Sequence, residues 1–297
     1  MKPLLLSLSL ITFANAQSAD DYRGGWRTDE KPAAQHTYEF SIRGDVVRGI
    51  YCTRCSDATT LAFIDGKLTP AGLTFTVTHV RPDGKTEFQD RATAKVDRGN
   101  LIVTGTSGAK GGGNFTWTMI KDPRGPDPLP IPIIMLPARE VPVLGGRGGG
   151  APKGPPAGGG APAAGPGYLQ PAPWKQLTAD DVVGIWLGFG AGINKQYFIF
   201  KKVGTQLRGM VCGRCDNPYT MAALDDIEIQ GDTLKFNIRH DDWGDYSIPF
   251  DKHVTAHIGA NEMRATTTQD NLPPGRNNGG AFSLMGPISI DATKGNP

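Results

Sequence analysis

The sequence has almost no excess charge of either sign and, after its first residues, lacks any long hydrophobic run. Lysine and arginine total 31 against 29 aspartate and glutamate, so the formal net charge is only +2. This balance argues against a nucleic-acid partner, which is normally bound by a basic surface. No segment reaches the roughly 20 apolar residues that span a bilayer, so no transmembrane segment is predicted.

Residues 1–16 have the pattern of a secretory signal peptide. Lys2 supplies a basic start, Leu4 to Phe13 form a short apolar run, and Ala14-Asn15-Ala16 is a small-residue cleavage site. We therefore expect a secreted or periplasmic protein after cleavage near Ala16. In an oxidising compartment, paired cysteines are expected to form disulfides.

The chain contains one unit twice. Residues 18–65 align with residues 178–225 without a gap, because each matched pair differs by 160 in residue number. Of these 48 positions, 15 are identical, including Gly24, Trp26, Phe40, Arg48, Gly49, Cys52, Arg54, Cys55 and Asp65 with their counterparts. Random pairing would not sustain this match without gaps, so the chain is an internal duplication.

A segment rich in proline and glycine separates the two copies. Residues 122–177 have one of these residues at nearly every second or third position, which predicts an extended linker. We therefore expect a signal peptide (1–16), a first repeat (17–121), a linker (122–177), a second repeat (178–288) and a C-terminal tail (289–297).

Each copy has the pattern of a small all-β domain. A Ser/Thr-Ala-Asp-Asp segment predicts one helical turn, which Gly24 or Gly184 ends. Apolar and polar residues then alternate, as in residues 197–202. In the first copy we predict strands near 24–28, 37–43, 46–52, 59–65, 73–79, 87–96, 100–105 and 113–119. Eight short antiparallel strands favour an up-and-down meander closed into a barrel.

The start of each copy resembles a known kind of barrel. Gly24-Gly25-Trp26 and Gly184-Ile185-Trp186 each follow the predicted helical turn. This Gly-x-Trp opening is similar to that of lipocalins and related calycins, and to the small Gly-x-Trp barrel repeats of secreted bacterial proteins. The resemblance implies two tandem lipocalin-like antiparallel barrels, each shorter than a true lipocalin.

The topology predicts which loops lie together. In an up-and-down meander, the connections after strands one, three, five and seven share one end of the barrel. In the first copy these are residues 28–36, 52–58, 80–86 and 106–112, and binding residues usually lie on such loops. We therefore predict ligand-binding residues at this rim: Arg54, His79, Arg214, His240 and Trp243.

Two of these residue types carry a specific chemical expectation. Arg54 and Arg214 lie at the centre of each Cys-x-Arg-Cys loop, where an arginine binds a carboxylate or sulfate, or pairs with an acid of its own domain such as Asp57 or Asp65. Trp243 is flanked by acids in a loop of the second copy only, an arrangement that suits carbohydrate stacking or a solvated turn.

The four cysteines allow two interpretations. Cys52 with Cys55, and Cys212 with Cys215, are expected to form local disulfides that close tight loops. The alternative is a zinc-type site in each copy, from Cys52, Cys55 and His79 or from Cys212, Cys215 and His240. Redox exchange would need a helix after the first cysteine, and haem attachment a histidine after the second; both patterns are absent.

We expect a non-catalytic secreted binding or scaffold protein, whose partner is a small molecule, a glycan or a protein, and which carries no cofactor. The alternative is a metal-binding protein or enzyme that uses the cysteine and histidine rim. An enzyme would show a concave pocket where His79 or His240 meets another polar group, and a scaffold would show a filled barrel interior. His36, His253 and His257 have no counterpart in the other copy and are expected to be surface or core residues.

Overall fold

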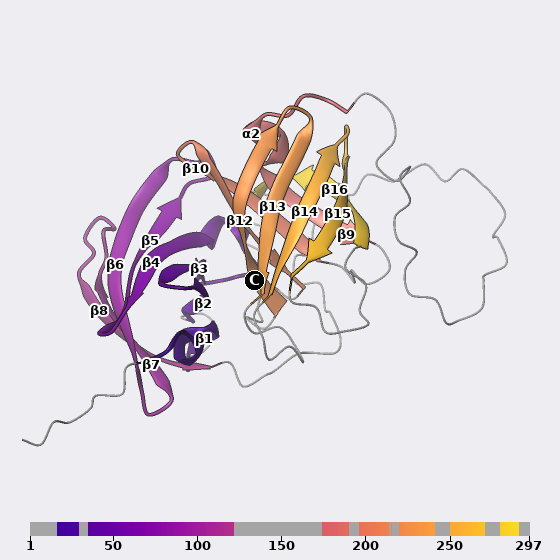
Figure 1. The fold of residues 1–297 in the computed structure, drawn as a ribbon. Helices are drawn as coiled ribbons and strands as arrows, with labels where there is room; N and C mark the ends of the chain where they lie inside the picture. Colours follow the sequence, from indigo (N-terminus) through magenta and orange to yellow (C-terminus); the bar gives the residue numbers. More distant parts are fainter. Residues whose placement is uncertain are drawn as a thin grey trace, which may run out of the picture.

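The computed structural model contains two closed eight-stranded antiparallel barrels that lie against each other (Figure 1). It describes residues 17–29, 35–121, 174–189, 196–213, 215, 220–240, 250–270 and 280–290. Within these residues, no helix has the length and apolar character needed to cross a membrane. The predicted all-β architecture of two tandem up-and-down barrels is confirmed. The signal peptide, residues 122–173 and the tail from residue 291 lie outside the described residues.

Barrel 1 follows the chain order without a crossover. A one-turn helix, α1 (Ala19–Tyr22), precedes eight strands, and β1 pairs with β8 to close the sheet. The strands are β1 (Gly24–Thr28), β2 (Thr37–Arg43), β3 (Val46–Cys52), β4 (Ala62–Thr69), β5 (Gly72–Val80), β6 (Thr86–Asp97), β7 (Asn100–Thr106) and β8 (Asn114–Lys121).

Barrel 2 repeats this order, and β16 pairs with β9 to close it. A one-turn helix, α2 (Ala179–Val182), again comes first. The strands are β9 (Gly184–Phe189), β10 (Tyr197–Val203), β11 (Gln206–Cys212), β12 (Met221–Gln230), β13 (Thr233–His240), β14 (Phe250–Ile258), β15 (Glu262–Gln269) and β16 (Gly280–Ile288). Trp174, in the predicted linker, stacks on His257 at 5.6 Å between ring centroids.

The motif that opens each repeat links the helical turn to the barrel core. The Asp21 carboxylate accepts a hydrogen bond from the Ser18 N–H at 2.6 Å, which caps the turn. The buried Trp26 indole N–H donates to the Tyr22 carbonyl at 2.7 Å, at the end of the same turn. Barrel 2 repeats the second contact, from Trp186 to Val182 at 2.9 Å. The Gly-x-Trp tryptophan therefore fixes the helical turn onto the barrel.

The predicted strands of the first copy match the observed ones closely, with one exception. The prediction began a strand at residue 59, but residues Ala58–Thr60 form a 3₁₀ turn, η2, and β4 runs from Ala62 to Thr69. Asp57 caps this turn by accepting the Thr59 N–H at 3.0 Å. Asp57 is 2% exposed, so its carboxylate is buried and needs the hydrogen bonds that this turn donates. The turn therefore competes with the strand, and β4 begins only at Ala62.

The alternation along β3 buries both faces of the strand. Val47 and Tyr51 point into the core of barrel 1, whereas Ile50 and Cys52 belong to a separate apolar cluster shared with barrel 2. Strand β11 repeats this pattern, with Met210 and Cys212 in the shared cluster. At Gly49, which the duplication retains as Gly209, a Cβ atom would lie 2.1 Å from the Glu39 carbonyl oxygen, so the adjacent strand leaves space only for glycine.

Charged groups beside the shared cluster pair reciprocally. Arg208 Nη1 lies 2.8 Å from Asp65 Oδ1, and Arg48 Nε lies 3.6 Å from Asp225 Oδ2. Arg48 and Arg208 are equivalent positions of the two repeats, and so are Asp65 and Asp225. Such an exchange of contacts is the pattern of an interface between two copies related by a two-fold rotation.

The ion pairs continue beyond these four residues. Arg239 Nε contacts Asp225 at 3.0 Å and its Nη1 contacts Asp251 at 3.2 Å. Arg43 of barrel 1 reaches the same Asp251 at 2.5 Å. The result is an alternating chain of arginines and aspartates that crosses between the barrels more than once and fixes their relative rotation.

The shared apolar cluster predicts an unequal response at two positions of β3. Ile50 is 1% exposed between the barrels, and Val46 is 42% exposed on the same strand. Ile50→Ala should lower the free energy of unfolding by about 2–5 kcal/mol, because it leaves a cavity at the interface. Val46→Ala is the control and should change it by less than about 0.5 kcal/mol. Urea unfolding followed by tryptophan fluorescence measures both; equal effects would contradict a close-packed interface.

Candidate functional site

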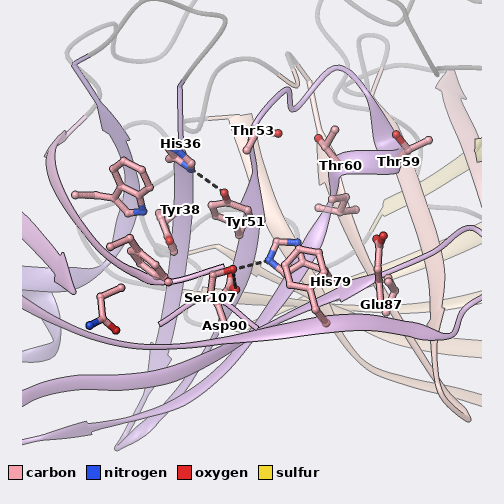
Figure 2. Close-up of a pocket in the computed structure, with 17 residues that line it drawn as sticks. His36, Tyr38, Tyr51, Thr53, Thr59, Thr60, His79, Glu87, Asp90 and Ser107 are labelled. Atoms are coloured by element: carbon pink, nitrogen blue, oxygen red, sulfur yellow. Dashed lines mark hydrogen bonds and ion pairs between the residues drawn. The ribbon is translucent and has the colours of Figure 1, made fainter. Parts of the chain in front are cut away.

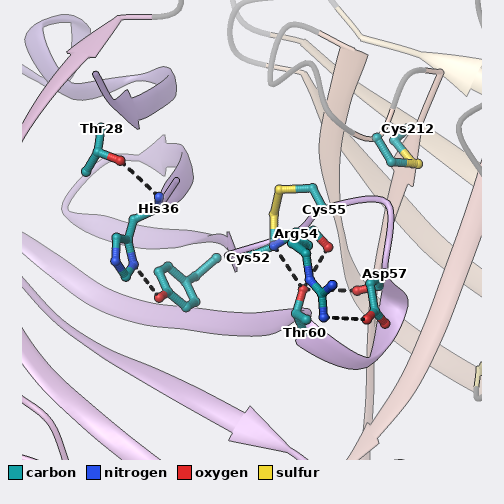
Figure 3. The surroundings of a disulfide bond; sticks show 10 residues. Thr28, His36, Cys52, Arg54, Cys55, Asp57, Thr60 and Cys212 are labelled. Carbon is teal, nitrogen blue, oxygen red and sulfur yellow. Dashed lines mark hydrogen bonds and ion pairs between the residues drawn. A yellow bond between two sulfur atoms is a disulfide. The ribbon is translucent and has the colours of Figure 1, made fainter. Parts of the chain in front are cut away.

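The cysteine pairs are local disulfides. Cys52 bonds to Cys55, Cys212 bonds to Cys215, and the described residues contain no free cysteine. Both pairs belong to the apolar cluster between the barrels, and Figure 3 shows the Cys52–Cys55 bond. The sulfur atoms of the zinc alternative are thus bonded to one another. No group of three or more His, Cys, Asp or Glu arranged to hold a metal ion occurs among the described residues.

Arg54 turns back onto its own loop. Its guanidinium lies 3.6 Å from the Asp57 carboxylate, the intradomain pairing considered from the sequence (Figure 3). The Thr60 hydroxyl donates to the Arg54 carbonyl at 2.8 Å and so ties the disulfide loop to η2. Arg214 and Trp243, and the side chain of His240, lie outside the described residues.

A pocket of about 500 Å³ opens at the predicted rim of barrel 1 (Figure 2). His79 from β5 lines it, but Arg54 does not. The other lining residues come from β2, β3, β5, β6, β8 and the loops after β1, β3 and β7. They include His36, Tyr38, Tyr51, Glu87, Asp90 and Trp117.

His79 and Asp90 form a hydrogen-bonded pair in this pocket. His79 Nε2 lies 2.9 Å from Asp90 Oδ2 (Figure 2). The other oxygen of Asp90 accepts hydrogen bonds from the Ser107 hydroxyl at 2.7 Å and the Gly108 N–H at 3.1 Å. The carboxylate therefore holds the His79 ring by Nε2, and Nδ1 has no hydrogen-bond partner among the described residues. Ser107 contacts the acid rather than the histidine, so the three residues are not a serine-nucleophile triad.

A second polar pair lies across the pocket. His36 Nδ1 is 2.7 Å from the Tyr51 hydroxyl, and the His36 ring stacks on Trp117 at 4.1 Å between centroids. His36, which the sequence led us to expect as a surface or core residue, thus lines the pocket. Tyr38 packs against Tyr51 at 4.9 Å, and its hydroxyl makes no hydrogen bond to any described residue.

Burial shifts the proton affinities of these groups. Desolvation lowers the pKa of His79 below its ordinary value, while the charge of Asp90 and the hydrogen bond to it act in the opposite direction. Desolvation also raises the pKa of Tyr51 and of Tyr38, and the nearby charge of Asp90 adds to both shifts. At neutral pH, His79 therefore presents a neutral Nδ1 acceptor, and both tyrosines remain hydroxyl donors.

Barrel 2 has replaced the polar groups at equivalent positions. The strand registers match Tyr38 with Phe198, Tyr51 with Val211, Trp117 with Phe282 and Asp90 with Lys252. Phe198, Val211 and Phe282 are buried in the apolar core of barrel 2, where the two phenylalanines stack at 5.5 Å. The polar lining described above is therefore a property of barrel 1 and not of the duplicated fold.

Comparison with known proteins adds no functional relative. No protein-family model matches the chain. No curated protein matches it either. A similar solved structure is that of a protein of unknown function from the DUF3598 family of Nostoc punctiforme PCC 73102. It shares 8% sequence identity and a TM-score of 0.22, covering 89% of this chain and 94% of that one. A TM-score of this size gives no basis for transferring fold or function.

The opposing effects on His79 predict the direction of a pKa change. Because Asp90 raises the pKa that burial lowers, Asp90→Asn should lower the pKa of His79 further. Asp83→Asn, in an exposed turn, is the control and should leave it unchanged. Imidazole titration by NMR measures the midpoints. A higher pKa of His79 in Asp90→Asn would contradict this assignment.

The lowered pKa of His79 also predicts how stability depends on pH. Between the pKa of His79 in the folded protein and 6.5, the unfolded chain binds more protons at His79 than the folded protein does. The contribution of His79 to the free energy of unfolding should therefore increase with pH in this range.

Proposed function

We propose that the protein binds a small molecule in the mouth of barrel 1, and that barrel 2 is its structural partner. The pocket carries the proposal, because it combines a volume suited to a small ligand with polar atoms that face it and have no hydrogen-bond partner among the described residues. These atoms are Nδ1 of His79 and the hydroxyl of Tyr38. Binding without catalysis, after export and cleavage near Ala16, remains the function that the sequence predicts.

The pocket lining indicates how such a ligand would be held. Trp117 and Phe115 stack at 5.7 Å on one side, and Phe88 stacks on His79 at 4.0 Å on the other. Aromatic rings provide large contact areas with little conformational freedom to lose. His79 Nδ1 would accept a hydrogen bond from the ligand, and the Tyr38 hydroxyl would donate one.

Acid–base catalysis is a second candidate, because the pocket in which His79 meets Asp90 is the feature that the sequence led us to expect of an enzyme. An imidazole that is held by a carboxylate at one nitrogen and open at the other can accept a proton from a bound molecule. Binding and catalysis differ in the fate of the ligand. A ligand whose NMR spectrum is unchanged after prolonged incubation supports binding alone, whereas conversion abolished by His79→Gln supports an enzyme.

The proposed function is tested by fluorine NMR on protein labelled with 5-fluorotryptophan. The protein has five tryptophans. Trp117 lines the pocket and Trp186 is buried in the core of barrel 2, so the Trp186 signal is an internal control. Trp117→Phe assigns the Trp117 signal. Some members of a set of soluble aromatic alcohols and amines should shift the Trp117 signal in a saturable way and leave the Trp186 signal unchanged.

A blocking variant with a matched control sharpens this test. Gly113 lines the pocket, and a Cβ atom there would meet no atom within 4 Å. Gly113→Phe should therefore be tolerated and should weaken binding at least about tenfold. Lys110→Phe lies in the same loop, is exposed and does not line the pocket, so it should bind as the unaltered protein does. Equal binding by both variants, or no probe that shifts Trp117, would contradict a ligand site here.

A further inference from the structure

We propose that the pocket of barrel 1 selects a positively charged organic ligand, a small amine or quaternary ammonium compound; this rests on the proposed function. The described residues that line the pocket include the carboxylates of Glu87 and Asp90 but no lysine or arginine. They also include the rings of Tyr38, Tyr51, Phe88, Phe115 and Trp117. Aromatic faces combined with acids attract organic cations, because the ring faces are electron-rich.

The cations nearest to the pocket do not oppose this selection. Arg54 is directed toward Asp57, 3.6 Å away. Lys201 lies behind the pocket wall, where its charge helps to lower the pKa of His79 and is opposed by the carboxylates of Asp57 and Glu87. The lowered pKa of His79 keeps its ring uncharged at neutral pH. An anionic ligand would thus meet two carboxylates and no free cation within the described lining.

Three probes of the same shape isolate the charge. Choline, its neutral carbon isostere 3,3-dimethylbutan-1-ol and the anion 3,3-dimethylbutanoate are titrated against the fluorine signal of Trp117. Choline should bind at least about tenfold more tightly than the alcohol, a preference of the size that cation–π contacts and a carboxylate provide. The anionic probe, 3,3-dimethylbutanoate, should not bind detectably.

Two variants connect this preference to a residue. Glu87→Gln should reduce the choline-to-alcohol ratio several-fold, and Asp83→Asn, an exposed acid outside the lining, should leave it unchanged. Equal affinity for choline and the alcohol would overturn charge selection while leaving the proposed ligand site intact. A Trp117 signal that none of the three probes shifts would also overturn it, because a cation-selective pocket must respond to choline.

A different observation carries a second inference: we infer that Lys201 of barrel 2 positions the pocket wall of barrel 1. Lys201 is 1% exposed, although it lies on the outer face of β10. Its ammonium group lies 3.0 Å from the Leu61 carbonyl oxygen, 3.2 Å from that of Ala58 and 3.3 Å from that of Val80, with a fourth carbonyl, of Thr59, at 3.4 Å.

These carbonyls come from the two segments that form one side of the pocket. Thr59, Leu61 and Val80 all line it: Thr59 lies in the η2 turn, Leu61 directly follows that turn, and Val80 ends β5. The equivalent residue in barrel 1 is Ser41, so the contact has no counterpart in the opposite direction. Lys201 thus joins two segments of the other barrel by a buried charged donor that their carbonyls share.

Amide hydrogen exchange tests this inference without any ligand. Lys201→Met should increase exchange at least about tenfold in residues 58–62 and 79–81, and should leave β7 on the far side of barrel 1 unchanged. Lys202→Met alters the neighbouring residue, whose side chain instead pairs with Asp180, and should leave all these segments unchanged. Lys201→Arg keeps the cationic donors and should restore much of the protection.

The pattern of exchange decides the outcome. Faster exchange of β7 together with the wall segments would show that Lys201 stabilises the whole domain, and would overturn a positioning role. Unchanged exchange of the wall segments in Lys201→Met would overturn it as well. Neither result bears on whether the pocket binds a ligand, so the two proposals fail separately.

Discussion

The packing of barrel 2 against the outer face of β3 and β4 is the constraint on which the rest of the structure depends. In an isolated up-and-down barrel this face would meet water, and its residues would be polar. Here Ile50 and Phe63 are buried on it, and the reciprocal pairs of Arg48 with Asp225 and Arg208 with Asp65 border the apolar contact. Because apolar burial supplies stability and paired charges specify orientation, the two barrels have one defined arrangement.

The duplication has produced two copies of one frame with different interiors. Polar groups in a barrel mouth cost stability unless they are hydrogen-bonded, and barrel 1 has two, on Tyr38 and His79, that face its pocket with no partner in the described part of the chain. Barrel 2 has Phe198 and Val211 where barrel 1 has Tyr38 and Tyr51, and these residues are buried in an apolar core. The apolar core of barrel 2 can offset the cost of a polar site in the copy that it supports.

The sequence predicted the frame well because its signals are local. Hairpin glycines such as Gly44, with φ of 61°, and the alternation along β10 depend only on neighbouring residues. The start of β4 was wrong because the carboxylate cap from Asp57 competes with the strand. The pocket was partly found: His79 was predicted from topology. Asp90, Tyr51 and Trp117 were missed, since recognising them requires the register of several strands at once.

One signal for these residues was present in the duplication. At interior positions where the first copy is polar and the second is apolar, such as Tyr51 against Val211, the fold itself does not require the polar residue. Lys201 gave no comparable signal, because a lysine at an outward position of a strand normally faces water. Only the presence of barrel 1 over that face converts it into a buried donor, and no pattern within either repeat contains that information.

The segment between β3 and β4 connects these observations physically. A disulfide that closes so short a loop stabilises a fold by only about 2 kcal/mol in the chain-entropy treatment, so its position matters more than its strength. Cys52 and Cys55 pack against barrel 2, Thr53 lines the pocket of barrel 1, and Lys201 binds the carbonyls that follow. One segment therefore contacts the other barrel on one side and the pocket on the other. Since coupling between two binding equilibria is reciprocal, a ligand that orders this wall must strengthen the contact between the barrels by the same free energy that the contact contributes to ligand binding.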